Sequence, residues 1–389
     1  MDLKRNIQKE LEKSILEYPI VALLGPRQAG KTTVLKKTFP HYSYVLLEDP
    51  DKLEFALSDP KGFLNQYRNT HGLIIDEAQK APELFSYLQG IVDEENRPGQ
   101  FILSGSQNFY LSEKISQTLA GRVCILTLLP LSLSEIKAAN QLPNHYEKIL
   151  FCGQYPRLYA NEIDTHKWYL NYIRTYIERD VRQIKHITDL HLFQKFLGLC
   201  AGRIGQVVNW SQLANDCGIT TQTAISWISI LEASYLVFLL YPYHQNFNKR
   251  LIKSPKIYFY DTGVACALLR ISSFDQVSTH YLKGGLFESF VLSELMKREY
   301  NQGLTPHLYF WRDQSDHEID CIYENGPKTI PVEIKSSETL NSKFFNNLIY
   351  WNKLAQKDSS HSYLIYGGQE RQNRSAGHVL GWEAVDEIN

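Results

Sequence analysis

The chain has 389 residues, more than one ordinary hydrophobic core accommodates, and its 43% hydrophobic and 21% charged content excludes a globally disordered protein. The formal net charge of −1 provides no overall attraction to nucleic acid, so such binding would need a local basic patch. The sequence has no apolar run of membrane-spanning length and no signal-peptide core at its polar start, and its six cysteines are scattered, so we expect a cytoplasmic protein with reduced cysteines and no membrane partner.

The first predicted strand and helix flank a glycine-rich loop with the full spacing of a P-loop. In such a loop the glycines let backbone N–H groups curl around phosphate oxygens, and the helix N-terminus adds its positive dipole end. Lys31 is expected to reach the β- and γ-phosphates of ATP, and the Thr32 hydroxyl is expected to bind Mg²⁺. The residues expected to surround the nucleotide are Gly25, Pro26, Arg27, Gln28, Ala29, Gly30, Lys31, Thr32 and Thr33.

A second aliphatic strand, "GLIID", ends in the acidic pair Asp76 and Glu77. Ligands of parallel α/β sheets bind at the C-terminal edge of such strands. We expect Asp76 to hold Mg²⁺ through water and Glu77 to activate the attacking water. Alone, a strand end of this kind is often only solvated, but downstream of a complete P-loop it indicates hydrolysis.

Two further candidates follow in the chain. The strand "GQFILSGS" ends in small hydroxyl residues, and Ser106 is a candidate sensor of the γ-phosphate, with Ser104 as the alternative and a simple turn as the other interpretation. Arg122 precedes the next aliphatic strand. It is a candidate to reach the γ-phosphate of a neighbouring subunit, although a surface arginine at a strand start is the alternative.

These motifs resemble those of bacterial and archaeal AAA+-type ATPases that carry a conserved C-terminal domain of unknown function. The resemblance continues through "GQYPR", "YIRTYIERDV", "KSPKIYFYDTG", "FESFV", "YFWRD" and "VEIKSS", so it covers nearly the whole chain. It implies an α/β P-loop AAA+ ATPase core over residues 1–130, fused to DNA-associated modules. It also implies a homo-oligomer, since AAA+ sites usually lie between subunits.

The middle of the chain is predicted to be helical. Residues 131–190 are expected to form a small helical lid, which begins with a Ser-x-x-Glu capping box. Residues 191–257 are expected to form a winged helix, in which Gly218 separates two helices and the second helix buries Ile225, Ile228 and Leu231. Lys256 is expected to add to the basic character of its wing. The candidate contacts to DNA, mostly without sequence specificity, are Thr221, Gln222, Lys249, Arg250 and Lys253.

Residues 258–389 are predicted to contain a helix, three strands, a helix and a strand, an order that resembles the core of PD-(D/E)XK nucleases. Asp320 and Glu333 lie on two strands of one hairpin, so both can meet at one Mg²⁺ or Mn²⁺ ion. Alternation along the strand puts Lys335 on the same face as Glu333, where it can act on the attacking water. Glu288 on the preceding helix would be an accessory acid. The alternative is a solvated strand face with no chemistry.

The sequence therefore predicts an ATP-hydrolysing, DNA-processing protein with metal-dependent DNA endonuclease activity. The alternative function is a nucleotide-switched regulatory or scaffold protein whose C-terminal domain binds a partner without catalysis.

Overall fold

The computed structural model describes residues 3–106, 118–177, 187, 189–243 and 253–388. The chain forms two compact units. The first unit comprises Met1–Leu131 together with the short segments Ala233–Tyr235 and Glu299–Thr305, and the second comprises the rest. All six cysteines are free.

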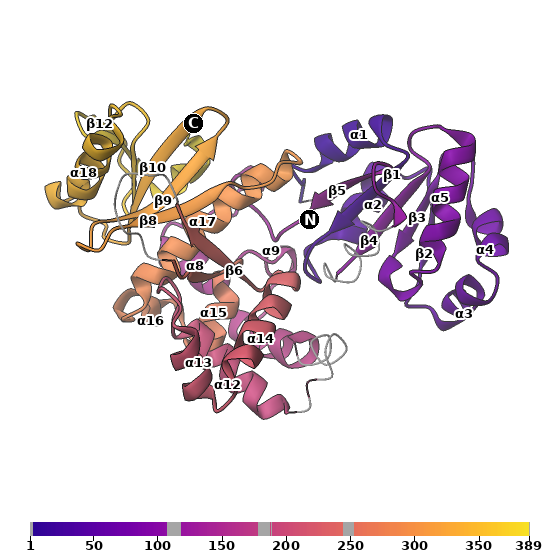
Figure 1. The fold of residues 1–389 in the computed structure, drawn as a ribbon, viewed down its shortest axis with the longest axis horizontal. Helices are drawn as coiled ribbons and strands as arrows, with labels where there is room; N and C mark the ends of the chain where they lie inside the picture. The colour runs from indigo at the N-terminus through magenta and orange to yellow at the C-terminus, as the bar shows by residue number, and fades with distance from the viewer. Residues whose placement is uncertain (1–2, 107–117, 178–186, 188, 244–252, 389) are drawn as a thin grey trace. The chain divides into compact units, whose positions relative to one another are not determined.

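The first unit is built on a five-stranded parallel sheet with the order β2-β3-β4-β1-β5 (Figure 1). Its elements are α1 (Gln8–Glu17), β1 (Ile20–Leu24), α2 (Lys31–Thr38), β2 (Ser43–Leu46), α3 (Pro50–Ser58), α4 (Pro60–Tyr67), β3 (Leu73–Asp76), η1 (Ala78–Lys80), α5 (Leu84–Glu95), β4 (Phe101–Gly105) and β5 (Val123–Thr127). Strands β1 and β3 are buried along their whole length, because helices cover both faces of a parallel sheet.

One face of this sheet carries a single apolar cluster. Residues of α1 and α2, among them Leu11 and Leu35, pack against Val21 and Leu23 of β1 and Ile102 of β4. Strand β1 has neighbours on both sides, and the loop after it leads directly into α2. This topology places the P-loop over the middle of the sheet, at the C-terminal edge of its strands.

The second unit contains an eight-stranded mixed sheet with the order β12-β13-β11-β10-β9-β8-β6-β7. Its elements before the hairpin β9–β10 are α7 (Leu133–Ala138), α8 (Tyr146–Cys152), α9 (Pro156–Ala160), α10 (Thr165–Tyr172), the π-helical turn η2 (Ile173–Ile177), α12 (Leu190–Ala201), α13 (Trp210–Cys217), α14 (Thr221–Ala233), β6 (Val237–Pro242), β7 (Lys256–Phe259), α15 (Thr262–Leu268), α16 (Phe274–Thr279), α17 (Lys283–Asn301) and β8 (Leu308–Arg312). The remaining elements are β9 (Glu318–Asn325), β10 (Lys328–Lys335), η3 (Ser342–Phe345), α18 (Asn346–Ala355), β11 (Tyr363–Tyr366), β12 (Gln372–Arg374), β13 (Gly377–Gly381) and η4 (Trp382–Glu387). The order α17, β8, β9, β10, α18, β11 is the helix–strand order that the sequence predicts for this region.

The eight-stranded sheet runs across an expected domain boundary. The sequence places the end of a winged helix at residue 257, but this position lies inside β7. Strand β7 pairs with β6. Strand β6 also pairs with β8, through Tyr241–Tyr309 and Pro242–Phe310. The boundary after residue 257 is therefore wrong, because hydrogen bonds between strands join the two regions into one sheet.

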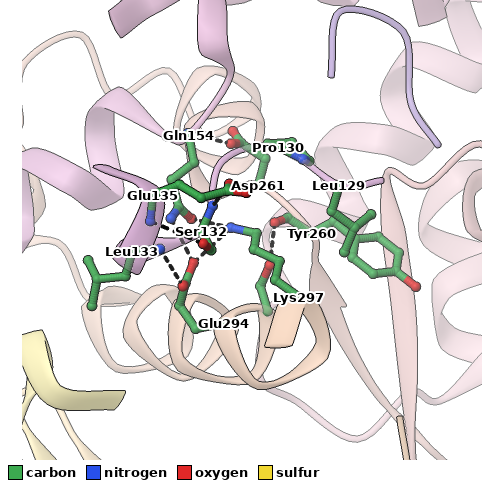
Figure 2. A network of polar contacts seen from close by, with 12 residues as sticks. Leu129, Pro130, Ser132, Leu133, Glu135, Gln154, Tyr260, Asp261, Glu294 and Lys297 are labelled. Carbon is green, nitrogen blue, oxygen red and sulfur yellow. Dashed lines mark hydrogen bonds and ion pairs between the residues drawn. The ribbon is translucent and has the colours of Figure 1, made fainter. Parts of the chain in front are cut away.

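The helices before the sheet also belong to the second unit. The predicted capping box is present, since Ser132 and Glu135 each accept a hydrogen bond from the backbone of the other. Figure 2 shows Glu294 and Lys297 of α17 directed toward Gln154, which follows α8. Glu294 accepts hydrogen bonds from the Leu133 backbone at 2.6 Å, from Gln154 at 2.7 Å and from Lys297 at 2.8 Å. These buried charges are satisfied, so the network ties α7 and α8 to α17 rather than leaving a separate lid domain.

The two predicted helices around Gly218 are α13 and α14, and Gly218 has a φ of 87° at the end of α13. One predicted core position is wrong: Ile225 is 38% exposed, whereas Trp227 is buried. The Trp227 ring lies edge-on to Phe193 and Phe196 of α12, at centroid distances of 5.2 and 5.3 Å. This aromatic packing turns α14 so that Ile225 faces outward.

Candidate functional site

The loop between β1 and α2 has the backbone of a phosphate-binding cradle. Gly25 has a φ of 148°, and a Cβ atom at this position would lie 2.0 Å from the carbonyl oxygen of Leu128. Gly30 caps α2 with a φ of 95°. Both positions require glycine, so that the loop can pass close to the neighbouring strand and turn into the helix. A backbone cradle of this kind fits the phosphate groups of ATP.

Lys31 is the first residue of α2 and is buried. Its Nζ atom donates hydrogen bonds to the carbonyl oxygens of Gly25 at 2.8 Å and Pro26 at 2.9 Å. Burial lowers the pKa of Lys31 to about 8, against the opposing effect of the negative charges of Glu77 and Asp76. The ammonium group lies across the loop, and a phosphate group bound there would give it a negative partner that favours its charged form.

Arg5 holds the other side of the loop, a role that sequence motifs do not indicate. Its guanidinium is buried and donates to the carbonyl oxygens of Ala29 at 2.6 Å and Leu129 at 2.7 Å. The arginine precedes α1 and thus joins the P-loop to the segment after β5. Arg27, within the loop, forms an ion pair, since its Nη1 atom lies 3.4 Å from Glu48 Oε1.

Asp76 lies at the end of β3 and is surrounded by hydroxyl donors. Thr32 and Tyr44 donate to its Oδ2 atom at 2.6 and 2.8 Å, and Ser104 donates to its Oδ1 atom at 2.5 Å. The carboxylate is 2% exposed. Tyr44 comes from β2, the neighbouring strand, and no motif in the sequence points to it. Burial and the charge of Asp76 raise the pKa of Tyr44, so its hydroxyl stays protonated and donates.

Glu77 follows Asp76 directly and adopts a left-handed backbone conformation with a φ of 57°. This conformation is rare for a residue with a side chain and is typical of functional positions that the surrounding structure stabilises. The Oε2 atom of Glu77 accepts hydrogen bonds from Gln79 at 2.5 Å and Ser106 at 3.2 Å. The two serine candidates therefore contact different acids: Ser104 contacts Asp76, and Ser106 contacts Glu77.

Arg122 lies before β5, at the N-terminal edge of the sheet, opposite the edge that carries the P-loop. Its Nε and Nη2 atoms bind the two carboxylate oxygens of Asp93 at 2.5 and 2.9 Å. Arg122 is thus held by Asp93 at this edge of the sheet. Action on the nucleotide of a neighbouring subunit stays a prediction.

The hairpin of β9 and β10 brings the C-terminal candidates together. Lys335 Nζ lies 2.7 Å from Asp320 Oδ2 and 2.5 Å from Glu333 Oε2. Asp320 also accepts a hydrogen bond from the backbone of Ile334 at 2.8 Å. Glu333 is fully buried, and neither of its oxygens has a hydrogen-bond partner of good geometry among the described residues.

Glu288 of α17 joins the same cluster through Tyr258, which no motif indicates, and Lys256, which the sequence places in the wing. Tyr258 donates to Glu288 Oε2 at 2.7 Å, and Lys256 Nζ lies 3.9 Å from this oxygen. Lys256 also forms an ion pair with Glu318. The expectation that Lys256 contributes to a basic wing is wrong, because the side chain is buried and faces these acids.

The cluster is electrostatically coupled. Burial would raise the pKa of Asp320, but the charges of Lys335 and Lys256 outweigh it and hold the pKa at about 2. Burial and the nearby Asp320 charge raise the pKa of Glu333 well above its usual range, and the same causes raise the pKa of Glu288 to about 7. Two acids that share a site cannot both ionise freely, so a proton or a cation is needed between them.

The donor set around Asp320 and Glu333 fits Mg²⁺ or Mn²⁺. Hard cations of this size prefer carboxylate oxygens, and the carboxylates of Asp320 and Glu333 both approach one point, at 2.7 and 2.5 Å from Lys335 Nζ. An ion at this position would take the place of Lys335 Nζ between the two carboxylates.

The residues predicted to contact DNA are placed in part. Thr221 and Gln222 are exposed at the start of α14, and Lys253 is exposed before β7. Lys249 and Arg250 lie outside the described residues. Ile204 and Val207 form bridges to β7, which adds a short segment beside the β6–β7 pair.

The contacts of Tyr44 predict an effect on magnesium use. We expect Tyr44→Phe to lower ATP turnover by about tenfold at limiting Mg²⁺ and to raise the Mg²⁺ concentration needed for half-maximal turnover, because partners of a metal-binding carboxylate fix its orientation. Turnover measured over a Mg²⁺ titration checks this. Tyr42→Phe is the matched control, since the Tyr42 hydroxyl donates to the Gly99 carbonyl instead. A wild-type Mg²⁺ dependence of Tyr44→Phe would contradict the assignment.

The strand order, the cradle and the acids at the sheet edge define a P-loop ATPase. Residues 17–137 match the AAA domain family, residues 283–385 match a domain of unknown function (DUF4143), and residues 143–275 match another (DUF8612). An uncharacterized protein of Mycobacterium tuberculosis is 31% identical over 401 residues, which cover 99% of this chain and 86% of that protein. The chain therefore belongs to the family of AAA-type ATPases with a C-terminal DUF4143 domain. Its fold implies binding of ATP and Mg²⁺.

Other relatives are more distant. An uncharacterized protein of Methanocaldococcus jannaschii is 26% identical over 316 residues, which cover 68% of this chain and 65% of that protein. Among solved structures, a Walker-type ATPase of Pyrococcus abyssi has a TM-score of 0.47 with 15% identity and covers 69% of this chain and 96% of that chain. A Holliday junction branch migration motor of Thermotoga maritima has a TM-score of 0.32 with 16% identity and covers 60% of this chain and 88% of that chain.

Among the helices that the structure describes, none has both the length and the apolar composition needed to cross a lipid bilayer.

Proposed function

We propose that this AAA-type ATPase is a DNA-processing protein that couples ATP hydrolysis to DNA binding and to metal-dependent DNA cleavage. The observation that carries the proposal is the cluster of the buried acids Asp320 and Glu333 with the partly exposed Lys335, which meet across one hairpin with Glu288 beside them. Two acids and a lysine at this separation suit the hydrolysis of a phosphodiester.

On the ATPase side, Lys31 and the loop backbone bind the phosphates, and Thr32 and Asp76 hold the cation. When bound there, Mg²⁺ would supply positive charge to offset the negative charge of the γ-phosphoryl group of ATP. Glu77 takes a proton from the attacking water, and the hydrogen bonds from Ser106 and Gln79 orient its carboxylate. Asp76 keeps a fixed position because three hydroxyl groups donate to it.

For DNA contact, support comes from the helix pair α13–α14 and the adjoining β6–β7 pair, an arrangement of the kind found in winged helices. The exposed hydroxyl and amide groups of Thr221 and Gln222 can bind phosphates, and Lys253 adds a positive charge. Phosphate contacts position a protein on DNA without reading its sequence. DNA of any sequence is therefore the expected partner.

At the C-terminal cluster, Asp320 and Glu333 would hold Mg²⁺ or Mn²⁺ and Glu288 would assist. Lys335, released from between the carboxylates, is then near enough to orient the attacking water and to stabilise charge on the phosphate. The proposed assembly is a homo-oligomer in which Arg122 acts on a neighbouring nucleotide.

One observation favours a second function, that of a nucleotide-switched regulatory or scaffold protein with an inactive C-terminal binding domain. Lys335 and Lys256 already pair with all four acids of the cluster, namely Glu288, Glu318, Asp320 and Glu333. A cluster in which every acid already has a lysine partner does not depend on a metal ion for its ion pairs, and without a metal ion it has no chemistry to perform.

A DNA panel tests the proposal. We expect duplex, single-stranded or branched DNA to stimulate ATP turnover, and we expect nicking that needs Mn²⁺ or Mg²⁺. Replacing Lys249, Arg250 and Lys253 by alanine should weaken DNA binding and flatten its salt dependence by about one unit of slope per lost phosphate contact. Lys328→Ala, at an exposed end of β10, is the control for removal of one positive charge elsewhere on the surface.

The outcomes separate the two functions. ATP turnover without DNA stimulation or nicking on any substrate would favour the regulatory function. An unchanged salt slope in the triple variant would place the DNA contact outside these three residues.

A further inference from the structure

Away from the hairpin cluster, three metal-binding side chains from two distant parts of the sequence converge in the second unit. His145 and Glu147 lie at the start of α8, and Glu338 lies in the segment after β10. One ligand atom from each residue lies within 4.8 Å of the others. We propose that His145, Glu147 and Glu338 form a binding site for one Zn²⁺ ion.

The donor set fits this ion. Zn²⁺ binds imidazole nitrogen and carboxylate oxygen, and sites with three protein ligands leave a fourth position for water. The side chains of His145 and Glu338 make no hydrogen bond or ion pair with the described residues, so both are available as ligands. Glu147 is buried, which favours a cation beside it once the side chain is ionised.

The backbone around the site is held in place before any ion binds. Tyr146 lies between His145 and Glu147 in the sequence, and Ser336 lies two residues before Glu338. The Tyr146 hydroxyl donates a hydrogen bond to the Ser336 carbonyl oxygen at 2.5 Å. Gly367 packs against this contact, since a Cβ atom there would lie 2.7 Å from both Ser336 O and Tyr146 Cε1. The two ligand-bearing segments therefore cannot separate freely, which lowers the entropic cost of bringing the ligands together.

A pocket of about 610 Å³ gives the ion access from solvent, and His145 and Glu338 are among its lining residues. Lys283 opposes binding, because its Nζ atom lies 3.0 Å from Glu147 Oε1. Zn²⁺ must therefore bind the second carboxylate oxygen or displace the ammonium group. Removal of the lysine charge should strengthen zinc binding.

Zinc titration of the chelator-treated, nucleotide-free full chain tests the site. All proteins carry Asp320→Asn, so that the hairpin cluster is impaired in every sample. We expect one Zn²⁺ per chain, with affinity weakened roughly tenfold or more in His145→Ala and in Glu338→Gln, since loss of a direct ligand costs at least as much as loss of a residue that only orients one. Lys283→Met should bind zinc more tightly, and Co²⁺ should report the imidazole ligand by its visible absorption.

His191→Ala and Glu162→Gln, which replace exposed residues of the same types, are the matched controls and should bind as the parent does. Zinc binding that is unchanged in both His145→Ala and Glu338→Gln would overturn the proposal, as would a chain that binds no zinc. Metal binding is the readout, so the result does not depend on ATP turnover or DNA cleavage.

Discussion

ATP turnover by Glu77→Gln is expected to fall by about 10²- to 10⁴-fold while ATP binding stays near that of the wild type. The glutamine amide keeps the shape of the side chain and can still accept from Ser106 and Gln79, but it cannot take a proton from water. Phosphate release gives the turnover, and fluorescence of a labelled ATP analogue gives the binding.

Two further variants make this result specific. Lys31→Ala should lose ATP binding itself, because the ammonium group of Lys31 lies inside the loop that binds phosphate. Glu83→Gln replaces an exposed acid next to α5 and should turn over ATP as the wild type does. Turnover by Glu77→Gln at the wild-type rate would remove Glu77 from the role of general base.

DNA cleavage is expected to be abolished by Asp320→Asn and by Glu333→Gln, each of which should also weaken Mn²⁺ binding. One carboxylate alone does not hold Mg²⁺ or Mn²⁺ against the water shell of the ion. Lys335→Ala should differ: it should retain Mn²⁺ and lose the rate of cleavage, because the lysine acts on the water and the phosphate. Nicking assays and Mn²⁺ titrations measure the two effects separately.

Stability must be followed in these variants, since the acids are buried beside lysines and a buried charge without its partner is destabilising. Thermal unfolding and unaffected ATP turnover identify the variants that remain folded. Lys328→Ala, on the same strand as Lys335 but exposed, should cleave normally. Cleavage that survives in a folded Asp320→Asn protein would contradict a metal site at this hairpin.

Several features were predictable because they depend on neighbouring residues. The loop from Gly25 to Thr32 is formed by consecutive residues, so its shape depends on their backbone conformations alone. The structure has the strand, turn and helix that its sequence predicts. The same holds for the capping box of Ser132 and for the β9–β10 hairpin, whose turn sets the register that brings Asp320 near Glu333.

Short motifs and strand alternation are thus enough to predict the ATPase class and the pairing of acids on one hairpin. Tertiary structure alone decided which distant residues join them: Arg5 at the P-loop, Tyr44 at Asp76, Lys256 in the acidic cluster, and the sheet that continues past residue 257. The physical reason is that periodicity records which face of an element is buried. The partner met on that face depends on the packing and register of elements far apart in the chain.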